Sequence, residues 1–102
     1  RILLCRTKLL YKKSVIKQQM HYVYLLKSTI DYRIYVGCTD DLKNRLFRHN
    51  SEKVKSTKAY CPWVLVYYEA YKEKSDATKR EVRLKMHAVK KELMKQIKES
   101  VK

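Results

Sequence analysis

The chain of 102 residues is predicted to form an α+β fold, a small three-stranded antiparallel sheet flanked by helices. Segments rich in aromatic and β-branched residues, which are typical of strands, alternate with segments whose apolar residues follow a helical spacing. The length suits a single domain, and a hydrophobic content of 45% is enough for one modest core. The sequence therefore predicts one domain in which helices pack on a sheet.

Three strands are expected. The first reads HYVYLLK, residues 21–27, and the second reads YRIYVG, residues 32–37. The short turn between them, at residues 28–31, predicts an antiparallel hairpin. A polar loop over residues 51–60 then leads to a third strand, WVLVYYEA, residues 63–70.

Three helices are expected between and after the strands. The first should run over about residues 41–52, the second should continue to residue 85, and the third should cover residues 88–101. In the third, apolar residues recur at every fourth position, which predicts a narrow apolar face. The expected starts are Thr39 or Asp40 as the cap of the first helix, and Ser75 or Asp76 for the second.

The charge of the chain predicts a polyanionic partner. It carries 25 Lys and Arg against 10 Asp and Glu, a formal net charge of +15. Such a charge attracts a nucleic-acid backbone, with an anionic membrane surface as the other candidate. Residues 1–20 contain six basic residues and no acidic one. We interpret them as a basic, disordered extension: a targeting peptide, a nucleic-acid arm or, the interpretation we favour, extra sequence before a natural start at Met20.

The cysteines and the hydropathy indicate a cytoplasmic protein. The three cysteines are widely spaced and form no CxxC pair, so we interpret them as reduced thiols. No apolar run reaches the length of a bilayer-spanning helix. The β-rich middle of the chain argues against attachment to a membrane surface, since amphipathic anchors need no sheet, so we expect no membrane partner.

A few residues stand out before any resemblance is considered. Gly37 is the single glycine, which indicates either a positive φ, a close approach by another group, or an ordinary turn at a strand end. Arg45 and His49 lie four residues apart and hence on one helix face, near Arg48. They suit phosphate binding and proton transfer, but an ordinary solvated face would look the same.

Glu81 is predicted to point toward the domain. It shares a helical stripe with Ala77 and Leu84, and a carboxylate in such a place needs a partner. A divalent metal, an arginine or one of the many lysines could supply it. The tyrosines of the first two strands either pack in the core or orient a water molecule.

Together these residues resemble the GIY-YIG nuclease family. The two triads appear as Tyr22-Val23-Tyr24 and Tyr35-Val36-Gly37, and the similarity continues through YVGCTDDLKNRLFRHN, STKAYCPWVLVYYEA and ATKREVRLK. It covers about residues 21–87, and the short stand-alone forms related to the nuclease domain of the UvrC repair protein are the most similar. The resemblance implies a nuclease domain over residues 21–87 and a basic C-terminal helix over 88–102, packed on this domain or extending from it.

The resemblance also implies a site and a mechanism. Its catalytic residues would be Tyr24, Tyr35, Arg45, His49 and Glu81, with Gly37 structural at the site. Glu81 would hold one divalent ion, Mg²⁺ or Mn²⁺. Tyr35, helped by His49, would activate a water molecule, and Arg45 would stabilise the phosphate charge. The chain departs from the family at Tyr22, where the name-giving triad has Gly, and at Cys38, where some relatives have Lys.

The expected function is a metal-dependent endonuclease. DNA is the favoured nucleic acid, and structure-selective cleavage in repair or recombination is the favoured role. The alternative is a catalytically inactive, basic nucleic-acid-binding module. A partner protein or a homodimer could supply specificity. The residues expected to contact nucleic acid are Lys43, Arg48, Lys53, Lys55, Lys58 and Arg80.

Overall fold

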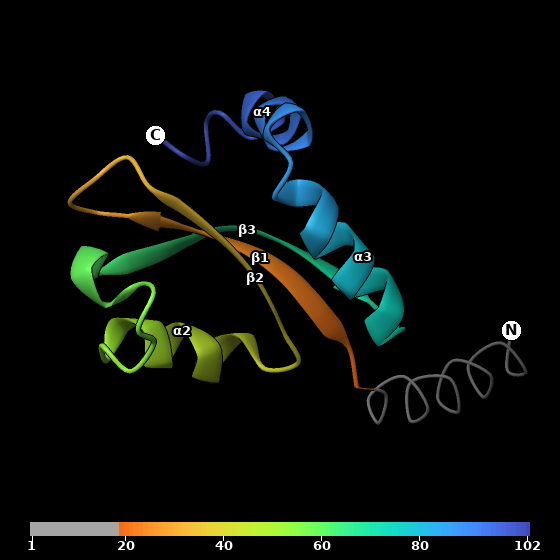
Figure 1. Ribbon diagram of the computed structural model, residues 1–102, viewed down its shortest axis with the longest axis horizontal. Coiled ribbons are helices and arrows are strands. Elements are labelled where there is room, and N and C mark those ends of the chain that lie inside the picture. Colours follow the sequence, from red (N-terminus) through yellow and green to blue (C-terminus); the bar gives the residue numbers. More distant parts are fainter. Residues whose placement is uncertain (1–18) are drawn as a thin grey trace, which may run out of the picture.

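The sheet has three antiparallel strands. The computed structural model describes residues 19–102, so the expectations for residues 1–18 lie outside the described part. The strands are β1 (His21–Ser28), β2 (Ile34–Thr39) and β3 (Trp63–Tyr71). They are arranged in the order β2-β1-β3, with β1 antiparallel to both neighbours (Figure 1). The predicted α+β fold, with its hairpin and its three-stranded sheet, is confirmed.

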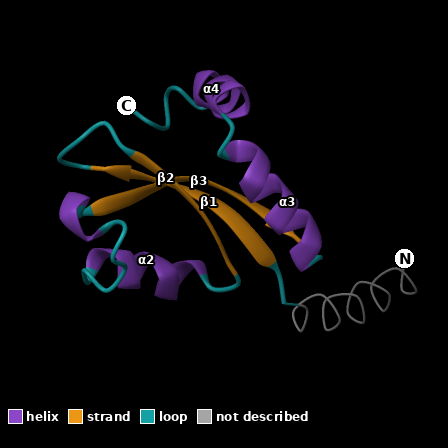
Figure 2. Ribbon diagram, in the orientation of Figure 1, coloured by secondary structure: helices purple, strands orange, loops and turns teal. Residues whose placement is uncertain are grey.

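Helices cover both faces of this sheet. Helix α2 (Leu42–Asn50) lies on one face, and α3 (Lys74–Leu84) and α4 (His87–Gln96) lie on the other, as Figures 1 and 2 show. A short 3₁₀ turn, η1 (Lys58–Tyr60), precedes β3. The domain is therefore a three-layer arrangement in which the sheet separates α2 from α3 and α4.

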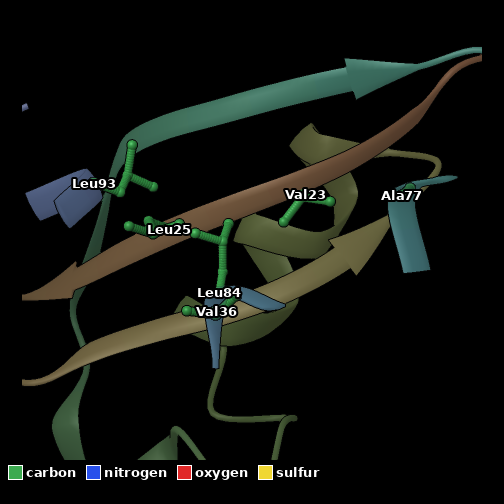
Figure 3. Packing of buried hydrophobic residues seen from close by; sticks show 6 residues of the cluster. All are labelled: Val23, Leu25, Val36, Ala77, Leu84 and Leu93. Atoms are coloured by element: carbon green, nitrogen blue, oxygen red, sulfur yellow. The ribbon is translucent and has the colours of Figure 1, made fainter. Parts of the chain in front are cut away.

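The alternation of side chains along β1 builds two apolar clusters. Val23 and Leu25 point to the α3 and α4 face, whereas Tyr24 and Leu26 point to the α2 face. All four are at most 1% exposed, because β1 is the central strand and both of its faces are covered. The first cluster consists of Val23, Leu25, Val36, Ala77, Leu84 and Leu93 (Figure 3).

The helix boundaries differ from those expected. The cap of α2 is Asp41, whose carboxylate accepts from Asn44 N at 3.1 Å. The expected caps, Thr39 and Asp40, were wrong by one or two residues. The Thr39 hydroxyl instead accepts from Asp41 N at 3.1 Å, and so shapes the turn before the cap.

The other helices also begin or end earlier than predicted. Helix α3 begins at Lys74, one residue before the earlier expected start, because Glu73 opens it without a side-chain cap bond. Helix α4 ends at Gln96 rather than at residue 101, and Ile97 leaves the helical conformation. Helix α2 ends at Asn50 instead of residue 52. Uncapped ends carry little sequence signal, which explains these errors.

Strand β2 begins two residues later and ends two residues later than predicted. The hairpin closes with a hydrogen bond from Ser28 N to Arg33 O at 3.0 Å, so residues 29–33 form the turn. Gly37 consequently lies inside β2, directly opposite Tyr24 in the register. Its φ is not positive. A Cβ at this position would collide with the hydroxyl and ring of Tyr24, so the close-approach interpretation of this glycine is the correct one.

Replacing Gly37 by alanine should destabilise the domain. The added methyl group overpacks the contact with Tyr24, and such overpacking typically lowers the free energy of unfolding by about 1–3 kcal/mol. Urea unfolding followed by circular dichroism measures this. The control is Cys38→Ala, on the other face of the same strand, which should cost less than about 1.5 kcal/mol. An unchanged stability in Gly37→Ala would contradict the close approach.

Candidate active site

The phenol of Tyr24 is the centre of a hydrogen-bonded cluster. Tyr24 lies on β1 and is 1% exposed. Its Oη is 2.9 Å from Nε2 of His49 and accepts a hydrogen bond from Nε of Arg45 at 3.2 Å. Arg45 and His49 both project from α2, one turn apart. The structure thus brings these three predicted residues together.

The hydrogen bonds of His49 fix the position of its proton. The imidazole is fully buried, and its Nδ1 is 2.8 Å from the hydroxyl oxygen of Thr57. This hydroxyl donates to the carbonyl of Val54 at 3.3 Å, and a carbonyl can only accept. We therefore assign the imidazole proton to Nδ1, with the Thr57 oxygen as its acceptor, which leaves Nε2 unprotonated. The phenol of Tyr24 accordingly donates to Nε2.

Burial keeps the side chains of His49 and Tyr24 uncharged. Desolvation, together with the nearby charges of Arg45 and Arg48, lowers the pKa of His49 from 6.5 to about 4. Desolvation also raises the pKa of Tyr24 to about 12, although the hydrogen bond from Arg45 acts in the opposite direction. At neutral pH the imidazole and the phenol are therefore both neutral.

Tyr35 lies beside the hydrogen-bonded series of Thr57, His49, Tyr24 and Arg45, but it is not a member of that series. Its ring packs edge-on against His49, with centroids 4.8 Å apart, and against Trp63 at 6.3 Å. Both ring nitrogens of His49 are already bound to Tyr24 and Thr57, so His49 supports Tyr35 by packing. Tyr35 and Arg45 are half-buried. The hydrogen bond that Arg45 donates to Tyr24 is the main cause that raises the pKa of Arg45, and Tyr35 adds to it.

Glu81 lies on α3, across the sheet from α2. It lines a pocket of about 420 Å³ together with Cys38 and Thr39 at the end of β2. Its side chain is 22% exposed, and Oε2 is 3.5 Å from Nζ of Lys85. Burial and then the Glu81 charge raise the pKa of Cys38, and the same carboxylate contributes to the raised pKa of Tyr24. Glu81 is therefore electrostatically close to the Tyr24 cluster, although no hydrogen bond in the described structure joins them.

The sequence profile of the GIY-YIG catalytic domain matches residues 20–94. This match includes all three strands and every residue of the cluster. The chain belongs to the GIY-YIG family.

Similar proteins agree with this assignment. A UPF0213 protein of Bacillus pumilus is 44% identical over 66 residues, which are 64% of this chain and 66% of that protein. A UPF0213 protein of Staphylococcus haemolyticus is 42% identical over 66 residues, 64% of this chain and 79% of that protein. The solution NMR structure of a UPF0213 protein from Bacillus halodurans is similar with a TM-score of 0.50 and 32% identity, covering 76% of this chain and 84% of that chain. The predicted relationship to short, stand-alone GIY-YIG proteins is confirmed.

The residues around Glu81 fit the divalent ion that the family implies. Within residues 19–102, no three His, Cys, Asp or Glu side chains are grouped so that they could enclose a metal. The Glu81 pocket does contain oxygen ligands, from Asp40, Thr39 and Thr78, beside the side chains of Lys74 and His21. Mg²⁺ and Mn²⁺ accept such hard donors, and Mg²⁺ keeps most of its water when one or two carboxylates hold it. The pocket thus suits a hydrated ion rather than a closed zinc site.

The predicted nucleic-acid contacts fall into two groups. Five of them are exposed on α2 and the loop after it: Lys43, Arg48, Lys53, Lys55 and Lys58. Arg80 is different, because its Nε and Nη2 bind the two carboxylate oxygens of Glu69 at 2.8 and 2.9 Å. Tyr67 and Tyr71 donate to the same carboxylate. Arg80 would have to share or leave this ion pair to bind a phosphate. None of the helices in residues 19–102 is long and apolar enough to cross a membrane.

Thr57 is the residue of the cluster that the sequence reasoning missed. It lies in the loop that follows α2, is fully buried, and its carbonyl accepts from the indole Nε1 of Trp63 at 2.9 Å. The segment STKAYCPW, which carries part of the family resemblance, contained both residues. Only the packing of this loop against α2 reveals that Thr57 determines the tautomer of His49.

The buried His49 should make stability depend on pH. Its pKa of about 4 in the folded chain lies below the ordinary 6.5, so the unfolded chain binds more protons between these values and stability falls as the pH is lowered through this range. From pH 7 to pH 5 the loss should be roughly 2 kcal/mol. Urea unfolding at both pH values measures it. His49→Gln should lose this component and His87→Gln, at an exposed position, should retain it; equal slopes in all three chains would contradict the neutral imidazole.

Proposed function

We propose that this chain is a metal-dependent endonuclease that hydrolyses phosphodiester bonds, with DNA as its substrate. The observation that carries the proposal is the arrangement of Arg45. Its Nε is held by Tyr24, which is itself fixed by a neutral His49, while Arg45 remains partly exposed and lies near Tyr35. A cation held in this way is prepared to bind a phosphate before the substrate arrives.

Arg45 would bind and stabilise the reacting phosphate. The hydrogen bond to Tyr24 uses only Nε, and Tyr35 lies within hydrogen-bonding reach of the same guanidinium. The terminal amino groups would donate to phosphate oxygens beside Tyr35. Their planar geometry suits bidentate binding of a phosphate. The negative charge that develops during hydrolysis would then be stabilised without rearrangement of the guanidinium.

Tyr35 is the phenol that would orient the attacking water. It is half-buried, whereas Tyr24 is 1% exposed. Tyr24 also donates its proton to His49 and has a pKa of about 12, so it is a poor base and acts as a positioning residue. His49 in turn acts through Tyr24, by holding the phenol in the orientation that accepts from Arg45.

Glu81 would hold the divalent ion. A bound Mg²⁺ or Mn²⁺ supplies a Lewis acid for the phosphate oxygens and lowers the pKa of a water molecule. The carboxylate is already half-buried beside other oxygen donors. Its contact with Lys85 involves an exposed ammonium group at 3.5 Å, and such a pair is weak enough to be exchanged for a metal.

The charge of the chain supports a nucleic-acid substrate. The net charge is +15, and the exposed Lys43, Arg48, Lys53, Lys55 and Lys58 lie on the α2 side of the sheet, as the Tyr24 cluster does. They would hold the backbone of a duplex by release of counterions. The same proposal includes structure-selective cleavage in repair or recombination and a cytoplasmic location. It also includes a partner protein or homodimer that supplies specificity, and a division into a nuclease domain at residues 21–87 and a terminal helix.

A catalytically inactive nucleic-acid-binding module is the second candidate. The same basic surface favours it, as does the position of Glu81 on α3, across the sheet from the hydrogen-bonded Tyr24, Arg45 and His49. The two candidates differ in one observable. The enzyme cuts DNA in the presence of Mg²⁺ or Mn²⁺, whereas the module only binds it.

Glu81→Gln should abolish cleavage while leaving binding intact. Loss of the metal ligand should slow the cutting of supercoiled plasmid and of branched DNA at least about 100-fold with Mg²⁺ or Mn²⁺. DNA affinity, measured by fluorescence anisotropy in EDTA, should change by less than about threefold, because removing one carboxylate leaves the basic surface unchanged. The matched control is Glu99→Gln, at a carboxylate that is 71% exposed.

Two outcomes would contradict the proposal. If Glu81→Gln cuts as fast as the unmodified chain, Glu81 does not hold the metal. If neither chain cuts any substrate and both bind DNA, the inactive module is the correct function.

A further inference from the structure

A groove along the beginning of β2 is not used by the proposed chemistry. It has a volume of about 780 Å³. Its walls are the turn before β2, the segment around η1 and helix α4, which lie on three separate parts of the chain. Its lining includes the aromatic residues Tyr32 and Tyr60 and the basic residues Arg33, Lys90 and Lys91.

The charges in this groove suit a polyanion. Arg33, Lys90 and Lys91 line it, and among residues 19–102 no acidic residue lines it. Within the same residues, Lys90 Nζ donates one hydrogen bond, to the carbonyl of Ile34 at 3.4 Å, and Lys91 is exposed. Arg33 also bonds to Asp31 at 3.2 Å, but its side chain is still 57% exposed. Both lysines are therefore available for phosphate groups.

The aromatic residues in the groove suit unpaired bases. Tyr32 is 95% exposed, so the faces of its ring are open to a ligand. The guanidinium of Arg33 lies 4.0 Å above the ring of Tyr60. A base could stack on the outer face of this guanidinium or on Tyr32, since bases stack on aromatic rings and on arginine planes. A paired duplex offers no free base faces along its length for such contacts.

The groove leads directly to the proposed active site. Tyr35 and Thr57 line it, and both also contact His49. At the other end of β2, Cys38 and Thr39 line the Glu81 pocket. The groove, Tyr35 and the Glu81 pocket therefore follow one another along a single strand, at about 3.3 Å per residue.

We propose that this groove binds an unpaired, single-stranded segment of the nucleic-acid substrate. Bases stack on Tyr32 and on the Arg33–Tyr60 pair, while Lys90 and Lys91 hold the phosphates. The inference deepens the proposed function and rests on it for the position of the cut, at the junction between the single strand and a duplex bound along α2. The chain's own residues 1–20 are an unsuitable occupant, because they carry six basic residues and no acid.

Binding of labelled oligonucleotides in EDTA tests the groove separately from catalysis. The full chain is titrated into fluorescein-labelled oligothymidylate and into a labelled duplex, and anisotropy is measured. Tyr32→Ala should weaken single-strand binding about fivefold or more, the usual effect of losing one stacked base, and leave duplex binding unchanged. Lys90→Ala with Lys91→Ala should weaken single-strand binding about tenfold. Lys91→Glu, at an exposed position, replaces the double variant if that one fails to fold.

Matched controls use the same residue types outside the groove. Tyr68, which is 52% exposed on β3, provides Tyr68→Ala. Lys95 and Lys98, both exposed and outside the groove, provide a double alanine variant with the same loss of charge. Tyr68→Ala should keep single-strand affinity within about twofold of the unmodified chain. The Lys95 and Lys98 double variant should weaken binding clearly less than the Lys90 and Lys91 double variant does, because both remove the same charge and only the second pair lines the groove.

The outcomes separate this inference from the proposed function. Equal single-strand affinity in groove and control variants would overturn the groove, even if the chain cuts DNA. Loss of affinity in Tyr32→Ala, in a chain that cuts nothing with Mg²⁺ or Mn²⁺, would support the groove and refute the nuclease. Unlabelled polyglutamate could displace the labelled oligothymidylate as well as unlabelled oligothymidylate does, while Tyr32→Ala leaves single-strand affinity unchanged. This result would indicate an acidic protein partner and overturn the inference.

Discussion

The hydrogen-bonded chain from Thr57 through His49 and Tyr24 to Arg45 is the interaction on which the proposed site depends. Each bond fixes the direction of the next one, because the Val54 carbonyl can only accept and a neutral imidazole has one donor and one acceptor. The chain begins in the loop after α2, returns to α2 and crosses to β1. A half-exposed arginine is thus held by three groups that are at most 1% exposed.

Burial of this chain has an energetic cost that the surrounding structure offsets. A buried polar group is expensive unless it is fully hydrogen-bonded, and no buried side-chain nitrogen or oxygen atom in residues 19–102 lacks a partner. Gly37 leaves the space that the Tyr24 ring occupies, and Trp63 holds the loop of Thr57. On the other face of the sheet, Glu69 with Arg80, Tyr67 and Tyr71 forms a second satisfied network. The sheet between the two networks carries Tyr35 on β2 and separates Arg45 on α2 from Glu81 on α3.

The sequence predicted the elements well because their signals are local. Strand β1 was expected at residues 21–27 and is found at His21–Ser28, and the common face of Arg45 and His49 follows from helical geometry alone. Helix ends without a capping bond, as at Glu73, carried no such signal. The partner of His49 was not predictable either, since Thr57 is reached through a loop and Tyr24 through the sheet. The groove joins the turn at Tyr32 to α4, more than 50 residues away in the sequence, and therefore had no local signature at all.

The most direct test of this account is the protonation state of His49, read from the ¹⁵N chemical shifts of its imidazole ring by NMR near neutral pH. The account predicts a neutral ring with the proton on Nδ1 and an unprotonated Nε2, because Thr57 accepts and Tyr24 donates. This tautomer should persist down to about pH 5, since the pKa is about 4. A proton on Nε2, or a charged ring at neutral pH, would contradict the direction of the chain and with it the proposed positioning of Arg45.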